Sequence, residues 1–379
     1  MNRTQIYFDN AATTPLLPTA RDAMLPFWDE IYGNASSPYA TSRAARMALD
    51  GARIEVAKLI GAHADEIAWT GGGTESDNWA LLGVAFANLE KRGHFIISSI
   101  EHHAVLEVAG TLRELGFEVD FAPATKNGEI EAEAIEKLLR SDTLLVSVMS
   151  VNNETGAIQP ASEIARVCHE HGVLFHCDAT QSAGKTDLDV DLGMESGADL
   201  LTLSAHKIGG PKGVGALYIR RGTKMKPLLR GGAQERGRRA GTENVPGIAG
   251  FGAAATHARL NLESNRAHLE SLKSQLENGL LEMGQIEIIA QHAPRAPHIS
   301  SFIFCGMRAE SLALNLDLQG FAVGTGSACA SGALEPSHVL AAMGYDAKAA
   351  KSALRVSFGA QNTSEEVEEF LEVLESLRS

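Results

Sequence analysis

A regular alternation of short apolar segments with amphipathic ones restricts the fold of this 379-residue chain more than any other feature of its sequence. Apolar runs predict buried strands at Glu66–Thr70, Phe95–Ser99, Leu144–Met149, Val173–Cys177 and Leu200–Leu203. Apolar residues at helical spacing predict helices before and between these strands, at residues 44–60, 103–115 and 162–171. The alternation is typical of an α/β fold, in which helices cover both faces of a mostly parallel sheet.

The pattern changes after about residue 244. The segment Val245–Met283 reads as mainly helical, and short strands and helices follow it, at Ile286–Ala290, Ser300–Phe304 and 364–377. We therefore expect a large domain over residues 14–252 and a smaller α+β domain over residues 253–379, with residues 1–13 packing on the smaller one.

Charge and composition exclude several classes of function. The chain has 33 Lys and Arg against 47 Asp and Glu, a net charge of −14, which disfavours nucleic acid as a partner because phosphate binding needs a basic face. No apolar run approaches the roughly 18 residues that a membrane span requires, and Met1–Pro15 shows no secretory signal. The four cysteines have no zinc or disulfide spacing, so we expect reduced thiols in a cytoplasmic protein.

A glycine-rich turn, Gly71–Gly73, follows one expected strand and opens a helix near Thr74. The N–H groups and the dipole at a helix start attract phosphate, and the Thr74 hydroxyl could assist them. The turn matches neither the P-loop nor the dinucleotide fingerprint. It is therefore either a phosphate site of another kind or a plain glycine-rich turn.

Two further strand ends carry titratable side chains, where ligands of a parallel sheet usually bind. Asp178 could hold the protonated ring nitrogen of pyridoxal phosphate, or it could cap the helix that follows. Lys207 lies where an apolar strand enters a Gly/Pro loop, and partial burial there would favour the neutral amine that forms a Schiff base; a surface lysine is the alternative. Ser204 and His206 could add phosphate contacts, whereas the nearby Lys212 is expected to be solvated.

Three side chains elsewhere in the chain suggest contacts to a cofactor or a substrate. His102 follows a strand and could stack on a cofactor ring and relay protons near neutral pH, although a structural histidine is the commoner case. Asn153 lies in a polar loop suited to hydrogen-bonding a phenolic oxygen. Arg355 is a lone cation on an apolar strand, where it could clamp a substrate carboxylate or form an intradomain salt bridge.

Cys329 differs from the other cysteines because small residues surround it, from Gly324 to Gly332. A structural thiol normally lies among bulky apolar neighbours, whereas an accessible loop of small residues suits a reactive thiolate. The sequence therefore favours a chemical role for this cysteine.

Together these motifs closely resemble the cysteine desulfurases of the NifS/IscS type, which are pyridoxal-phosphate-dependent transferases of fold type I, the aspartate aminotransferase fold. The resemblance covers nearly the whole chain and rests on Tyr7–Thr14, Gly33–Asn34, Gly72–Ser76, Glu101–Val105, Asn152–Glu154, Asp178–Gln181, Ser204–Lys207, Arg236–Asn244 and Ser327–Cys329. It implies a large domain, with a mostly parallel seven-stranded sheet between helices, and a smaller α+β domain.

The resemblance also implies a role for each matching residue. Lys207 would form the Schiff base and move the Cα proton, Cys329 would carry the persulfide, and His102 would stack on the ring and relay protons. Contacts to the cofactor are implied for Lys207, Thr74, His102, Asn153, Asp178 at the pyridine nitrogen, Gln181 at the phenolic oxygen, Ser204, His206, and Thr242 from a second subunit. Contacts to the substrate are implied for Asn34, Asn153 and Arg355. No resident metal is implied, and Cys329 is the one residue that could touch a transferred iron–sulfur cluster.

The implied reaction converts L-cysteine to L-alanine and leaves the sulfur on Cys329, to supply iron–sulfur cluster assembly or other thio-cofactors. Its implied partners are a sulfur-acceptor or scaffold protein and a second copy of the chain in a homodimer. The alternatives are a selenocysteine lyase or another pyridoxal-phosphate-dependent lyase or aminotransferase of the same fold. A non-catalytic scaffold, or a metal-binding module of His102, His103, His176 and Cys177, is disfavoured because no ligand pair has zinc spacing.

Overall fold

The computed structural model describes residues 5–190, 197–304, 306–325 and 336–378. Its centre is a seven-stranded sheet in the order β2-β8-β7-β6-β5-β3-β4. The strands are β2 (Ile67–Thr70), β3 (His94–Ser98), β4 (Glu118–Ala122), β5 (Thr143–Ser147), β6 (Leu174–Asp178), β7 (Leu200–Ser204) and β8 (Gly215–Ile219). Strand β8 runs antiparallel to both neighbours and the other pairs are parallel, which confirms the expected mostly parallel sheet.

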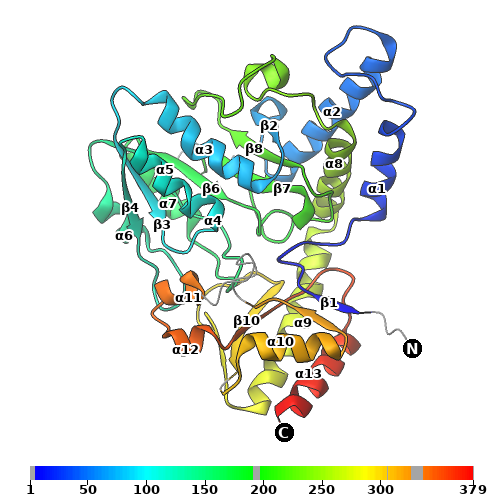
Figure 1. The fold of residues 1–379 in the computed structure, drawn as a ribbon, viewed down its shortest axis with the longest axis vertical. Coiled ribbons are helices and arrows are strands. Elements are labelled where there is room, and N and C mark those ends of the chain that lie inside the picture. Colours follow the sequence, from blue (N-terminus) through cyan, green and yellow to red (C-terminus); the bar gives the residue numbers. More distant parts are fainter. Residues whose placement is uncertain (1–4, 191–196, 305, 326–335, 379) are drawn as a thin grey trace.

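Helices cover both faces of this sheet (Figure 1). They are α1 (Pro18–Met24), α2 (Ala40–Leu59), α3 (Gly73–Ala87), α4 (His103–Leu106), α5 (Val108–Glu114), α6 (Ala132–Leu138), α7 (Ala161–Glu170) and α8 (Val245–Leu260). Because successive strand residues face opposite ways, Phe95 and Ile97 join a core with α3 and α5, whereas Ile96 joins the core with α2, α7 and α8. No helix in the described ranges is long and apolar enough to cross a bilayer.

The C-terminal part of the chain forms a smaller layer together with the first strand (Figure 1). Its strands are β1 (Ile6–Phe8), β9 (Ile286–Ile288), β10 (Ile299–Phe304), β11 (Phe321–Val323) and β12 (Ala353–Ser357), and its helices are α9 (Leu262–Met283), α10 (Ala309–Leu318), α11 (His338–Ala342), α12 (Ala347–Ala350) and α13 (Ser364–Arg378). Strand β1 pairs in parallel with β11, and β10 lies antiparallel between β9 and β12. Phe8 is buried against Phe321, Phe358 and Phe370, so the start of the chain is part of this core.

Two expected helices are interrupted in the structure. The helix expected over residues 103–115 is divided into α4 and α5 at Glu107, which keeps helical backbone angles (φ −66°, ψ −26°). The helical segment expected over residues 245–283 is divided at Asn261 (φ −111°, ψ 13°), whose Nδ2 donates to the carbonyl of His257 at 2.8 Å. Asn side chains compete with backbone N–H groups for hydrogen bonds to backbone carbonyls. A prediction from the spacing of apolar residues does not take this competition into account.

Candidate active site

A cavity of about 320 Å³ opens beyond the carboxyl ends of β5, β6 and β7. Nine predicted site residues line it: Thr74, His102, Asn153, Asp178, Gln181, Ser204, His206, Lys207 and Arg355. Asn34 and Thr242 are exposed and do not line it. Cys329 lies outside the described residues. The cavity therefore gathers side chains from strand ends, from the start of α3 and from the C-terminal strand β12.

The start of α3 is shaped to receive an anion. Gly72 has a φ of 152°, which residues with a side chain rarely adopt. A Cβ on Gly73 would lie 3.3 Å from Thr180 Oγ1 and 3.5 Å from Ser204 Cβ, so the lack of a side chain keeps space open beside these residues. The N–H groups of the first helical turn and the hydroxyls of Thr74 and Ser204 border this space, which suits a phosphate group.

Lys207 follows β7 in a short 3-10 turn and is half-buried at the cavity wall. Its Nζ donates to the carbonyl oxygens of Ala11 at 2.6 Å and Ala12 at 2.8 Å, which fixes the amine at the cavity. Lys212, by contrast, is exposed and is not part of the lining. Of these two lysines, Lys207 has the position that a covalent link to a cofactor requires.

Two other predicted cofactor contacts hold the same N-terminal segment against the sheet. Gln181 Nε2 donates to the Ala11 carbonyl at 2.8 Å, and its Oε1 lies 3.2 Å from His298 Nε2. His206 Nδ1 lies 3.0 Å from Thr13 Oγ1. Burial, the main cause, lowers the pKa of His206 to about 4, so its ring is neutral. Both side chains therefore border the segment that receives the lysine amine.

Asp178 ends β6 and is buried, and its Oδ1 accepts a backbone N–H two residues further on at 2.9 Å. Asp77 of α3 lines the same cavity, and burial followed by the charge of Asp178 raises its pKa well above the usual range. Burial lowers the pKa of the neighbouring His176 to about 3, and its ring contacts Ser147 Oγ at 2.8 Å and Thr202 Oγ1 at 3.1 Å. Because two close carboxylates in a dry site do not both ionise, we expect one negative charge on this wall.

Besides His206, three histidines lie at the cavity: His102, His103 and His338. His102 caps α4, where its Nδ1 accepts the N–H of Ala104 at 3.1 Å, so the neutral ring carries its proton on Nε2. Burial lowers the pKa of His102, which favours this neutral form. His338 Nε2 lies 2.9 Å from the carbonyl oxygen of Glu101, and its ring centroid is 4.7 Å from that of His103. His102 thus has the protonation state that a proton carrier near neutral pH needs.

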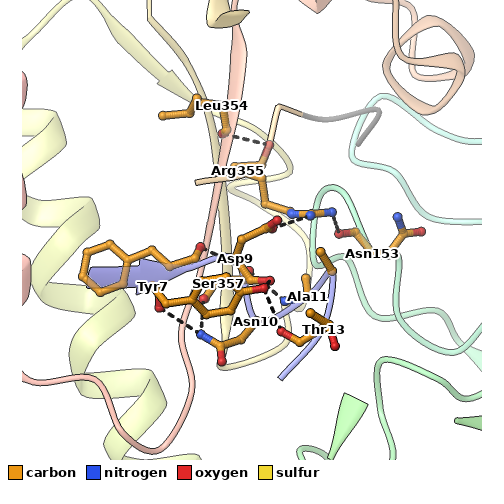
Figure 2. A network of polar contacts seen from close by, with 12 residues as sticks. Tyr7, Asp9, Asn10, Ala11, Thr13, Asn153, Leu354, Arg355 and Ser357 are labelled. Atoms are coloured by element: carbon orange, nitrogen blue, oxygen red, sulfur yellow. Dashed lines mark hydrogen bonds and ion pairs between the residues drawn. The ribbon is translucent and has the colours of Figure 1, made fainter. Parts of the chain in front are cut away.

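Arg355 on β12 is 2% exposed and lines the cavity. Its Nη2 donates to Asp9 Oδ1 at 2.7 Å and its Nη1 to the carbonyl oxygen of Asn153 at 2.8 Å (Figure 2). Two roles were considered for Arg355, a clamp for a substrate carboxylate and a salt bridge within the chain. The structure is compatible with both, because the guanidinium faces the cavity and also pairs with Asp9.

Glu101 is a buried acid just behind the cavity wall. Its Oε1 accepts hydrogen bonds from Ser98 Oγ at 2.5 Å and from the N–H of Met149 at 2.7 Å. Its Oε2 is buried and has no hydrogen-bond partner among the residues that the structure describes. Burial raises the pKa of Glu101 to about 8, so the side chain is a neutral acid at pH 7.

Replacing this acid with glutamine (Glu101→Gln) should change how stability depends on pH. An unfolded glutamate ionises near pH 4.3, about four units below the folded protein. The wild type therefore loses stability as the pH rises from about 4.3 to about 8, by at most about 1.4 kcal/mol per unit, whereas glutamine cannot titrate. Urea unfolding at pH 5, 6, 7 and 8 should show that the free energy of unfolding of the variant increases relative to that of the wild type at each step. A difference that stays constant with pH would contradict this assignment.

Sequence reasoning missed several residues at the cavity. Asp77, Glu154 and His338 line it without having been singled out, and Asp9 reaches it through Arg355. Burial raises the pKa of Glu154 to about 7, and its Oε2 accepts a 2.5 Å hydrogen bond from Ser337 Oγ, next to the start of α11. Two of them had a local signal: Glu154 lies in the Asn152–Glu154 motif, and Asp77 follows the predicted anion turn by one helical turn and so lies on the same face of α3.

The histidine–cysteine metal module, the alternative that the sequence disfavours, does not fit the geometry either. His176 and Cys177 are consecutive residues of β6, so their side chains point to opposite faces of the sheet. In the ranges that the structure describes, no group of three or more His, Cys, Asp or Glu side chains could hold a metal ion. The histidines at the cavity therefore offer no assembled ligand set.

Comparison with protein families gives a match over residues 6–370 to the family described as Aminotransferase class-V. Among curated proteins, the "Cysteine desulfurase IscS" of Methanosarcina thermophila is 46% identical over 369 residues, covering 97% of this chain and 91% of that protein. The "Cysteine desulfurase IscS" of Dictyoglomus turgidum is 44% identical over 374 residues, covering 98% and 94%.

Solved structures share the fold over nearly the whole chain. A "NIFS-LIKE PROTEIN" superposes with a TM-score of 0.91 at 38% identity and covers 99% of both chains. A structure titled "SspA in complex with cysteine" superposes with a TM-score of 0.83 at 35% identity, covering 94% of this chain and 99% of that one.

Proposed function

The chain belongs to the class-V aminotransferases and is a pyridoxal-phosphate-dependent cysteine desulfurase, and from this premise we propose which of its residues carry out the reaction. One observation carries the proposal: Lys207, Asp178 and the start of α3 line a single cavity. An amine, a carboxylate and an anion site are the three groups that hold the aldehyde, the ring nitrogen and the phosphate of this cofactor.

Pyridoxal phosphate, when bound, supplies an aldehyde that links to amines and a ring that accepts the electrons released at a substrate Cα. Thr74, Ser204 and His206 would hold its phosphate group, next to the first turn of α3. Asp178 would face the ring nitrogen. The neighbouring Asp77 is protonated, so the one negative charge on this wall would remain available to the ring nitrogen. Gln181 and Asn153 would hydrogen-bond the ring substituents, which their position in the cavity lining supports.

Lys207 and His102 would move the protons of the reaction. With substrate bound, the Lys207 amine would be free within the cavity and would take the proton from the substrate Cα. The carbonyls of Ala11 and Ala12, which now hold Nζ, would keep the amine within reach. His102 would stack on the ring and deliver a proton from Nε2, the nitrogen that carries it in the structure.

Arg355, Asn153 and Asn34 would hold the carboxylate side of the substrate. The guanidinium of Arg355 reaches the cavity, and a planar fork of donors matches a carboxylate. Asn34 is exposed, with its Oδ1 accepting the N–H of Ser36 at 2.9 Å, so it would reach the site from a neighbouring subunit or after a rearrangement.

Cys329 would take the sulfur. Its thiolate would attack the sulfur of the bound cysteine, so that a sulfur–sulfur bond forms while the carbon–sulfur bond breaks. The substrate Cβ then gains a proton and the carbon skeleton leaves as alanine, and Cys329 retains one added sulfur atom as a persulfide. A sulfur-acceptor protein or an iron–sulfur scaffold would remove that atom, and Cys329 would be the residue to touch a transferred cluster.

We further propose that two copies of the chain form a homodimer and that it works in the cytoplasm, where thiols stay reduced. The exposed position of Thr242 supports a contact to the cofactor of a second subunit, because this side chain does not line its own cavity. Residues 14–252 would form the large domain and residues 253–379 the small one, with residues 1–13 packed on it. The pairing of β1 with β11 supports this division.

Product analysis tests the proposed function directly. Purified protein supplied with cofactor, L-cysteine and a reducing agent should release alanine and sulfide in equal amounts. The same protein with selenocysteine should release alanine at a rate that does not exceed the cysteine rate by orders of magnitude. Alanine from selenocysteine alone would indicate a lyase specific for selenium, and formation of pyruvate or a transferred amino group would indicate another enzyme of the same fold.

A further inference from the structure

The guanidinium of Arg355 is already neutralised by a carboxylate of the chain itself. Asp9 Oδ1 lies 2.7 Å from Nη2, and the two partners of the guanidinium come from the segment after β1 and from the Asn153 loop (Figure 2). Arg355 Nε is buried and has no hydrogen-bond partner within the described ranges. The planar donor set is therefore only partly used, and the charge that would attract a substrate carboxylate already has a counter-ion.

Asp9 is held at this position by its surroundings. It directly follows β1 and forms a backbone bridge to Ser357, two residues after Arg355 on β12. Its carbonyl oxygen accepts hydrogen bonds from the Tyr7 hydroxyl at 3.0 Å and from backbone N–H groups (Figure 2). A Cβ on Gly324 would lie 2.8 Å from both Asp9 Oδ1 and Arg355 Nη2, so the backbone of this glycine packs directly against the ion pair. The ion pair is part of the fold and not a chance surface contact.

An arginine that is 2% exposed cannot remain unpaired without a large cost, so the free enzyme needs a counter-ion at this point. Under the proposed function the same guanidinium must also bind the α-carboxylate of the amino acid. We propose that Asp9 is an internal competitor of that carboxylate, which lowers the affinity of the site for every α-amino acid; this inference rests on the proposed role of Arg355.

The competition affects substrate and product alike. Cysteine and alanine carry the same α-carboxylate, so each must share Arg355 with Asp9 or displace it, and each is repelled by the Asp9 charge. An interaction that weakens or strengthens the binding of the ground state and of the transition state by the same amount changes KM and does not raise kcat. Asp9 therefore weakens the binding of cysteine and in return allows alanine to leave.

The variant Asp9→Asn removes the negative charge and keeps an oxygen that can accept from Nη2. We expect the KM for cysteine and the inhibition constant of alanine to fall together, each by about tenfold, with kcat unchanged or lower. We also expect the holoenzyme of the variant to melt at a lower temperature than the wild type, because Arg355 loses its counter-ion. Alanine should raise that melting temperature more in the variant than in the wild type.

Two matched variants separate charge from other effects. Asp9→Glu keeps the negative charge, so neither constant should fall as it does in Asp9→Asn. Asp22→Asn removes one carboxylate from an exposed pair with Arg21 and should change neither constant. If Asp9→Asn raises KM, or if alanine stabilises it no more than the wild type, Asp9 only orients Arg355 and the inference is wrong.

The variant Arg355→Lys distinguishes this failure from a failure of the proposed function. A lysine cannot offer the planar fork, so the KM for cysteine should rise strongly if Arg355 binds the carboxylate. If this KM rises while Asp9→Asn has no effect, the proposed function stands and the competition is refuted. If Arg355→Lys leaves KM unchanged, the role of Arg355 itself is wrong.

Discussion

Replacing Lys207 with alanine should reduce the release of alanine from cysteine by at least about 10²–10⁴-fold, the contribution of a positioned proton carrier. It should also remove the visible absorption band that a cofactor linked to a protein amine gives, because no amine remains at the carbonyls of Ala11 and Ala12. The cofactor itself should still bind through the start of α3 and Asp178. Absorption spectra and alanine assays of the purified variant measure both effects.

Lys212→Ala is the matched control, because Lys212 lies five residues further on but is exposed and outside the cavity lining. It should keep the band and the full rate. A Lys207→Ala protein that retains the band and its activity would require another lysine to hold the cofactor, and the proposed site would then be wrong.

Replacing Cys329 with serine should abolish the transfer of sulfur and leave cofactor absorbance intact. A hydroxyl is a much weaker nucleophile than a thiolate toward sulfur, and it cannot hold an added sulfur atom, so we expect the release of sulfide to fall on the order of 10³-fold or more. Mass spectrometry after a single addition of cysteine should find one added sulfur atom in the wild type and none in the variant.

Cys168→Ala controls for the loss of a thiol. Cys168 lies buried in α7, and burial raises its pKa to about 12, so it remains a protonated and unreactive thiol near neutral pH. This variant should form the persulfide at the wild-type rate. Detection of the added sulfur on Cys168, or full sulfide release from Cys329→Ser, would remove Cys329 from the proposed mechanism.

The site residues that could be predicted from sequence lie at the ends of strands or at the start of a helix. Thr74, Asp178 and Lys207 follow a glycine turn or an apolar strand, and the carboxyl ends of neighbouring parallel strands meet at one edge of the sheet. Local sequence therefore determines both the element and the side of the sheet on which these side chains lie. The same reasoning correctly separated Lys207 from the exposed Lys212.

The part that could not be predicted depends on contacts between distant segments. Asp9 and Arg355 are separated by 346 residues, and nothing near either one signals the other. His338 reaches the cavity because Ser337 is bonded to Glu154, a contact across 183 residues. The break at Asn261 is of another kind, since one side chain outweighs an otherwise continuous helical pattern.

The pairing of β1 with β11 has a consequence for synthesis of the protein on the ribosome. Tyr7 is aligned with Ala322, so the first strand has no partner until almost the entire chain has been translated. At roughly 5–20 residues per second, this interval lasts some tens of seconds. During that time the apolar face of Phe8 is uncovered and the carbonyls that later hold Lys207 are not in place, so the nascent chain has to be protected from aggregation before its active site can exist.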